Sequence, residues 1–264
     1  LAKEGSAEEV NDTFNAQALT MVLTVAIGKA LMAQGKKPDA LIGFSLGEIP
    51  ALAFAGAYDG MTGFRLACAR GASMARAGKN VNASMAAIVK LPDETVERLC
   101  AAYDHVWPVN YNCDGQIAVS GDRDELERLY ADVAAAGGRS MPLNVSGGFH
   151  SPYMDPASAE FGAILADTPL QKPTLPAYAN RTAEPYGENV RELLTQQINH
   201  PVRWKETLHH LNEQGFDTFV ECGAGMVLCK LVRKNLPECR SFAVDSLAGL
   251  AKLQEEGMLC CSAT

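Results

Sequence analysis

The sequence predicts an α/β fold, with a hydrolase-like core built on a parallel sheet and an inserted ferredoxin-like subdomain of βαββαβ order. A short apolar strand runs directly into Gly43-Phe44-Ser45-Leu46-Gly47 and then into a helix. Residues 81–144 show strand and helix patterns in the order β-α-β-β-α-β, and further strands and helices follow. We therefore expect a core of residues 1–80 and 145–264 and a small subdomain of residues 81–144.

The core patterns predict helices and strands in alternation. The expected helices are Asn11–Gln34, Glu48–Ala57, Met61–Met74, Pro152–Leu165 and Val190–Ile198, and the expected strands are Asp39–Gly43, Thr174–Ala179, Phe216–Glu221 and Phe242–Val244. The most apolar stretch, Ala18–Ala33, is interrupted by polar residues and glycine. It is therefore more typical of a buried helix than of a membrane span.

In the subdomain, apolar residues recur at helical spacing along Asp93–Tyr103 and Asp122–Ala136. Strands are expected at Met85–Val89, Val106–Asn110, Gln116–Ser120 and Ser140–Val145. This alternation of two helices with four strands is the basis of the ferredoxin-like prediction.

Composition limits the possible functions. Apolar residues make up 47% of the chain and charged residues 20%, which is ordinary for a globular enzyme, and the net charge of -8 argues against a general nucleic-acid binder. The eight cysteines form no C-x-x-C pair, so we expect reduced thiols and no metal site. The chain opens without a charged and then apolar leader, so we expect a cytoplasmic protein without a membrane partner.

Ser45 is the candidate nucleophile. A strand, a tight glycine-flanked turn and a helix are the order that a nucleophile elbow requires. The flanking glycines permit a strained backbone, and the N–H groups of the following helix, Leu46 first, would stabilise an oxyanion. The alternative is a chance match of small residues around a serine.

His150 is the candidate base among five histidines. It lies in a glycine-bearing loop between two predicted elements, where catalytic residues often occur, and imidazole titrates near neutral pH. His105, His209 and His210 are more typical of surface residues.

Arg70 lies on the predicted helix Met61–Met74, whose apolar residues face inward. Its ordinary interpretation is a solvated or salt-bridged arginine. The functional alternative is a guanidinium that holds a substrate carboxylate through two hydrogen bonds.

Together these segments resemble the malonyl-CoA:acyl carrier protein transacylase family, which is related to polyketide-synthase acyltransferase domains. The resemblance extends over nearly the whole chain. The matching stretches are Gly43-Phe44-Ser45-Leu46-Gly47-Glu48, Arg70-Gly71 with Met74, Val109-Asn110-Tyr111-Asn112, Val145 to Pro152, Ala179-Asn180, Gln197 with Pro201 to Trp204, and Glu221 to Gly225.

The resemblance implies a role for each matching residue. Ser45 would carry the acyl ester, His150 would be the base, and a backbone carbonyl at Gln197 would orient the histidine. Arg70 would bind the free carboxylate of malonate. Leu46, Phe149 and Asn112 would contribute to the substrate site, and the first two fit a preference for malonyl over branched acyl groups.

The resemblance also implies a ping-pong reaction. Ser45 would take malonyl from malonyl-CoA, and the phosphopantetheine thiol of acyl carrier protein would then take it from Ser45, with no cofactor. An acidic carrier protein needs a local cationic patch, for which Lys230, Arg233 and Lys234 are candidates. Arg203 is a candidate for the CoA phosphates. A solvated helix face is the alternative for the cationic cluster.

Three features depart from the family pattern. Phe44 replaces a histidine, so different packing is expected there. Gly223-Ala224-Gly225-Met226 replaces G-P-G-K, so a positive charge is absent. No segment matches the family's N-terminal strand and G-Q-G turn, which supplies a second oxyanion donor; we therefore expect weak activity or poor folding from this exact chain and normal activity from a longer one.

Three other functions fit parts of the pattern. A serine hydrolase of the α/β-hydrolase kind would need an acidic residue between serine and histidine and would not need Arg70. An acyltransferase domain of a larger synthase would share the same motifs. A non-catalytic relative would bind carrier protein without turnover.

Overall fold

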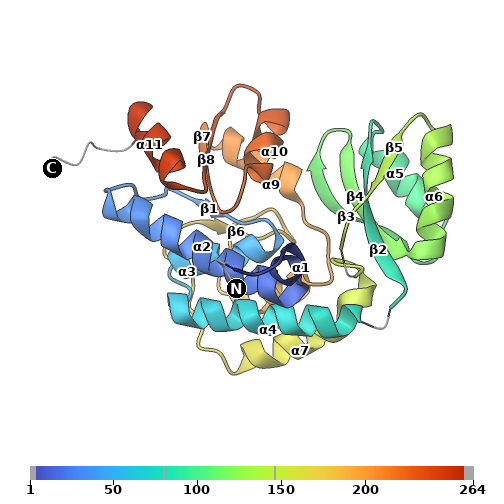
Figure 1. Cartoon of the computed structure of the whole chain (residues 1–264), viewed down its shortest axis with the longest axis horizontal. Helices are drawn as coiled ribbons and strands as arrows, with labels where there is room; N and C mark the ends of the chain where they lie inside the picture. The colour runs from blue at the N-terminus through green and yellow to red at the C-terminus, as the bar shows by residue number, and fades with distance from the viewer. Residues whose placement is uncertain (1–3, 80, 146, 259–264) are drawn as a thin grey trace.

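The computed structural model describes residues 4–79, 81–145 and 147–258 (Figure 1). The order of elements follows the sequence prediction closely. Helices and strands alternate in a core, and a smaller unit stands at one side of it (Figure 1). The protein is therefore α/β, as the sequence predicts.

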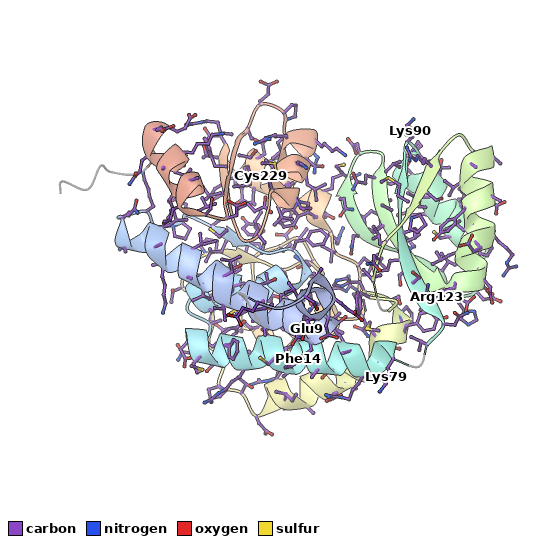
Figure 2. All side chains as sticks on the ribbon, in the orientation of Figure 1. Glu9, Phe14, Lys79, Lys90, Arg123 and Cys229 are labelled. Atoms are coloured by element: carbon purple, nitrogen blue, oxygen red, sulfur yellow. The ribbon has the colours of Figure 1, made fainter. Side chains whose placement is uncertain are left out.

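The first part of the core consists of helices around one short strand. They are α1 (Ala7–Asn11), α2 (Thr13–Ala33), β1 (Leu41–Ile42), a 3-10 turn at Ser45–Gly47, α3 (Glu48–Phe54) and α4 (Gly60–Gly78). The Asp12 side chain caps the start of α2 by accepting hydrogen bonds from two backbone N–H groups. The Asp59 side chain caps α4 by accepting one such bond. Helices α2 and α4 pack along each other, and Phe14 of α2 lies beside α4 (Figure 2).

The second part of the core contains three more strands. Its elements are a 3-10 turn at Pro152–Met154, α7 (Asp155–Ala166), β6 (Ala177–Tyr178), α8 (Val190–Gln197), α9 (Trp204–Glu213), β7 (Thr218–Cys222), α10 (Val227–Asn235), β8 (Arg240–Val244) and α11 (Leu247–Glu255). Helix α7 packs against both α4 and α8. Helix α10 packs on β7 and β8, and α11 packs on β8 (Figure 1).

The core strands are parallel, but they do not form one sheet within the described residues. β1 pairs with β6, and β7 pairs with β8. No hydrogen-bonded strand joins these two pairs in the part of the chain that the structure describes. In these residues the expected parallel sheet is present as two separate parallel pairs, and residues of both β1 and β7 line one cavity.

The smaller unit has four antiparallel strands and two helices. Its elements are β2 (Ala83–Val89), α5 (Asp93–Cys100), β3 (Val106–Cys113), β4 (Gln116–Asp122), α6 (Arg123–Ala135) and β5 (Arg139–Pro142). The strand order is β3-β4-β2-β5, so β3 and β5, the two strands that follow helices, form the edges of the sheet, and β4 and β2 lie between them. Lys79 and Arg123 mark its junction with the core (Figure 2).

Most residues of α2 are partly or fully exposed, contrary to the expectation of a buried helix. Only 17% of its most apolar window is buried. One face packs on α4, whereas other residues, including Thr20 and Thr24, line the cavity. By length and composition alone, α2 is the one described helix that could cross a membrane.

The main apolar core lies between α3, α4, α7 and α8, directly behind the Ser45 turn. Leu52 of α3 is fully buried there, whereas Leu247 of α11 is 84% exposed. We expect Leu52→Ala to lower the free energy of unfolding by about 2–5 kcal/mol, because it removes packed methyl groups and leaves a void.

Urea unfolding followed by circular dichroism measures this loss. Leu247→Ala is the matched control, with an expected change within about 0.5 kcal/mol. Equal effects of the two substitutions would contradict the assignment of this core.

Candidate active site

Ser45 lies in the tight turn between β1 and α3 and has a left-handed backbone, with φ of 51°. The side chain of Asn180 spans this turn. Its Oδ1 accepts from the Ser45 N–H at 2.7 Å, and its Nδ2 donates to the Gly43 carbonyl at 2.6 Å. These two bonds hold a backbone conformation that is unfavourable for serine, so Asn180 positions the turn.

Of the two flanking glycines, only Gly43 is required by packing. A Cβ at Gly43 would lie 1.9 Å from the carbonyl carbon of Gly47, which is an impossible contact. A Cβ at Gly47 would meet nothing within 4 Å, and the φ of Gly47 is −57°. The expected role of the second glycine is therefore not supported, because its backbone is compatible with any residue.

His150 is in contact with the Ser45 hydroxyl. Its Nε2 lies 2.8 Å from Ser45 Oγ, and its Nδ1 lies 2.9 Å from the carbonyl oxygen of Gln197. A carbonyl can only accept, so the Nδ1 carries the proton and the Nε2 is free to accept the serine hydroxyl proton. His150 is 4% exposed and also has a left-handed backbone, with φ of 59°.

Burial and charge keep His150 neutral. Burial first, and the neighbouring Arg70 guanidinium second, lower the pKa of the imidazole to about 4. The hydrogen bond to the Gln197 carbonyl raises the pKa and only partly opposes this lowering. At neutral pH the ring is therefore in the form that can accept a proton from Ser45.

Arg70 reaches the same serine from α4. Its Nη2 donates to Ser45 Oγ at 3.0 Å, and its Nη1 donates to Oε1 of Gln17 at 2.7 Å. The Nε and Nη2 both donate to Oε1 of Gln197, at 3.2 and 2.9 Å. Arg70 is 1% exposed, so the solvated-arginine interpretation is wrong.

Gln197 connects all three of these groups. Its carbonyl accepts from His150, its side-chain oxygen accepts from Arg70, and its Nε2 donates to the Ser45 carbonyl. The sequence expectation concerned only the carbonyl. The structure adds two side-chain contacts, so one residue of α8 orients the nucleophile, the base and the cation together.

A cavity of about 1350 Å³ opens over this cluster. Leu46, Phe149, Ser45 and Arg70 line it. The substrate-binding roles of Leu46 and Phe149 stay predictions. Asn112 does not line it: this residue is buried on β3, and its carbonyl accepts from the Asn235 side chain at 2.9 Å. The substrate role of Asn112 stays a prediction.

Three polar residues of this site were not assigned by sequence reasoning. Gln17 and Asn180 hold Arg70 and the Ser45 turn, and Glu48 is buried behind that turn at 1% exposure. A signal was present for two of them. Gln17 and Glu48 are polar residues within mainly apolar helical stretches, where a buried polar side chain needs a specific partner.

Phe44 and Met226, which differ from the family pattern, lie in different surroundings. Phe44 packs edge-to-face against Trp204, with ring centroids 5.5 Å apart, so it extends an apolar cluster and takes no part in the polar network. Met226 precedes α10 and is 45% exposed.

The expected cationic cluster lies on α10, where two of its members have partners. Arg233 donates to Ser241 and Lys234 donates to Gln116, and all three basic side chains belong to exposed residues. Arg203 forms an ion pair with Glu206 at 2.5 Å. Lys230 is therefore the member of this cluster most accessible to a partner.

The described part of the chain contains no group of three or more His, Cys, Asp or Glu side chains placed to hold a metal ion.

Comparison with known proteins identifies the family. The family described as "Acyl transferase domain" matches residues 3–261. This chain belongs to that acyl transferase family. The malonyl CoA-acyl carrier protein transacylase of Escherichia coli strain K12 is 33% identical over 262 residues, which are 97% of this chain and 85% of that protein.

Other relatives extend this similarity. PksC of Bacillus subtilis, a polyketide biosynthesis malonyl CoA-acyl carrier protein transacylase, is 35% identical over 89% of this chain and 82% of that protein. Among solved structures, a malonyl-transacylase bound to a type II polyketide acyl carrier protein has a TM-score of 0.92 at 33% identity, covering 96% of this chain and 84% of that chain. An acyl carrier protein S-malonyltransferase of Vibrio cholerae has a TM-score of 0.90 at 33% identity, covering 95% and 84%.

The two glycines of this acyl transferase give a matched pair of variants. We expect Gly43→Ala to lower the free energy of unfolding by about 1–3 kcal/mol or more, because its Cβ overlaps the Gly47 backbone. Gly47→Ala should leave stability within about 0.5 kcal/mol. Thermal unfolding of the two variants tests this, and equal losses would contradict the steric account.

The low pKa of His150 predicts an imidazole that stays neutral in mild acid. At pH 5.5 an ordinary histidine is about nine-tenths protonated, whereas His150 should remain almost entirely neutral. Nitrogen-15 NMR of the side chains measures this, with His150→Ala used to assign the signal.

Because the folded-state pKa is lowered, the contribution of His150 to stability is present above its ordinary pKa and is lost as pH falls through about 4. An imidazole signal that titrates near pH 6.5 would contradict the burial argument.

Proposed function

We propose that this acyl transferase moves a malonyl group from malonyl-CoA to the phosphopantetheine thiol of acyl carrier protein, through an ester on Ser45, in fatty-acid biosynthesis. The observation that carries the proposal is the 3.0 Å contact between Arg70 Nη2 and Ser45 Oγ. This contact places the Arg70 guanidinium, which can bind a carboxylate, directly beside Ser45. The proposed base, His150, contacts the same serine hydroxyl.

The first half-reaction follows from these contacts. Ser45 gives its proton to His150 Nε2 while Oγ attacks the thioester carbon of malonyl-CoA. The negative oxygen that forms is stabilised by the N–H of Leu46, because Asn180 already occupies the N–H of Ser45. The imidazolium then gives its proton to the departing CoA sulfur, which leaves malonyl on Ser45.

The second half-reaction reverses these roles. His150 takes the proton of the carrier protein's thiol, and the sulfur attacks the malonyl ester. The C–O bond breaks, and His150 returns the proton to Ser45. No metal or cofactor is needed for either step.

Arg70 supplies selectivity for a charged acyl group. A malonyl carboxylate can take hydrogen bonds from the guanidinium, whereas an acetyl group leaves this buried cation without an anion. The contact between His150 and the Gln197 carbonyl also favours the transferase over an α/β-hydrolase triad, which places a carboxylate at that position.

We also propose an architecture, a docking place for the carrier protein and a cellular location. The core is hydrolase-like, and residues 81–144 form a ferredoxin-like subdomain, supported by the strand order β3-β4-β2-β5. Acyl carrier protein docks near α10, where Lys230 is accessible. The enzyme acts in the cytoplasm.

Mass spectrometry after mixing with malonyl-CoA tests the function. We expect a malonyl adduct on Ser45 that is absent in Ser45→Ala. In Arg70→Ala, the rate of malonyl adduct formation relative to acetyl adduct formation from acetyl-CoA should fall by about 10²–10³-fold, because a charge-assisted pair is lost.

The acetyl reaction serves as the internal control for folding and for nucleophile activity. An unchanged malonyl-to-acetyl ratio in Arg70→Ala would contradict the role of Arg70. Absence of any Ser45 adduct would contradict the transfer reaction itself.

A further inference from the structure

Glu48 is a buried carboxyl that the proposed reaction does not use. It is the first residue of α3, immediately after the Ser45 turn, and is 1% exposed. Its Oε1 accepts from the backbone N–H of Asn180 at 2.6 Å and from the hydroxyl of Tyr186 at 3.0 Å. Its Oε2 has no hydrogen-bond partner. A buried carboxyl with one unpaired oxygen needs an explanation.

The charge of Arg70 provides that explanation. The hydrogen bonds that hold Arg70 come from neutral acceptors, Gln17, Gln197 and Ser45. Among the residues that the structure describes, no carboxylate forms an ion pair with it. Glu48 is the carboxyl whose field stabilises the Arg70 charge, and Arg70 in turn favours the ionised Glu48.

The other titratable groups around this pair are neutral. Tyr58 and Tyr186 both have a pKa well above the ordinary tyrosine value, because of burial first and of the Glu48 charge second. His150 is neutral through burial and the field of Arg70. The balance of charge beneath Ser45 therefore depends on Glu48 and Arg70 alone.

We propose that Glu48 is the exchangeable counterion of Arg70: above pH 7 it is ionised when the site is empty, and it takes up a proton when a substrate carboxylate binds Arg70. This inference rests on the proposed function, because it requires an acyl group with a free carboxylate. It makes binding of malonyl-CoA a proton-linked step, whereas binding of acetyl-CoA is not.

Electrostatics sets the direction of this coupling. One buried cation balances one buried anion, and a second carboxylate close by disfavours ionisation of the first. The substrate carboxylate can contact the guanidinium directly, whereas Glu48 lies behind the turn without an ion-pair contact. Glu48 is therefore the group that becomes neutral.

The pH window follows from the empty site. Burial raises the pKa of Glu48 to about 7, against the opposing effects of Asn180, Tyr186, Gln197 and Arg70. A bound carboxylate raises it further. At pH 8, free Glu48 is about nine-tenths ionised, so binding should take up close to one proton. The affinity for malonyl-CoA should accordingly fall with rising pH above 7, by at most tenfold per pH unit.

Calorimetry on Ser45→Ala measures this coupling, because that variant binds malonyl-CoA without forming the ester. Titrations at pH 8 in two buffers of different ionisation enthalpy give the number of protons taken up. We expect close to one proton with malonyl-CoA and close to none with acetyl-CoA. Equal proton uptake with the two ligands overturns the proposal.

Glu48→Gln in the Ser45→Ala background assigns the proton. The amide oxygen can still accept from Asn180 and Tyr186, so a structural role alone would leave the proton count unchanged. We expect the count to fall to nearly zero and the affinity to lose its pH dependence between pH 7 and 8.5. Glu213→Gln, which removes an exposed carboxylate, is the matched control and should keep the parental count.

Infrared difference spectra give a second measurement that does not depend on the Glu48 variant folding. A protonated-carboxyl band should appear when malonyl-CoA binds Ser45→Ala and should not appear with acetyl-CoA. Its absence with malonyl-CoA overturns the proposal, as does an unchanged proton count in Glu48→Gln.

The two proposals fail in different ways. If malonyl transfer is wrong, the Ser45 adduct is missing. If only the counterion role is wrong, the adduct forms but malonyl-CoA binds without proton uptake by Glu48.

Discussion

The burial of the Arg70 guanidinium is the constraint on which the rest of this site depends. Hydrogen bonds must satisfy a cation removed from water, yet a permanent carboxylate partner would compete with an anionic substrate. The chain meets both needs with amide oxygens, because Gln17 and Gln197 accept from Arg70 without cancelling its charge. The packing of α2 on α4, and of α7 on both α4 and α8, therefore serves the site as well as the core.

The same arrangement explains why strained backbone persists here. Ser45 and His150 both have positive φ, and each is held by contacts from a separate element. Asn180 bonds both sides of the Ser45 turn, and the Gln197 carbonyl fixes the imidazole. Strain of this kind costs free energy and survives only where the surroundings determine the geometry, so these polar contacts stabilise the reactive arrangement.

Local patterns predicted the nucleophile turn and most elements well, because strand, glycine turn and helix are encoded by neighbouring residues. What depends on distant contacts was not predictable. The sequence gives no reason to treat Gly47 differently from Gly43. The two differ in the space around them, which only the folded structure shows. The cavity is likewise lined by residues of α2, β1 and β7, which lie far apart in the sequence.

Charge balance links selectivity to the strength of the base. Arg70 selects an anionic acyl group, but its field also lowers the pKa of His150, which weakens proton transfer from Ser45. Glu48 stabilises the Arg70 charge from behind the turn while the site is empty. A substrate carboxylate bound to Arg70 brings a negative charge into the site and so offsets the field of Arg70 on the imidazole. A neutral acyl group does not, so the base is best supported when the substrate carries its own charge.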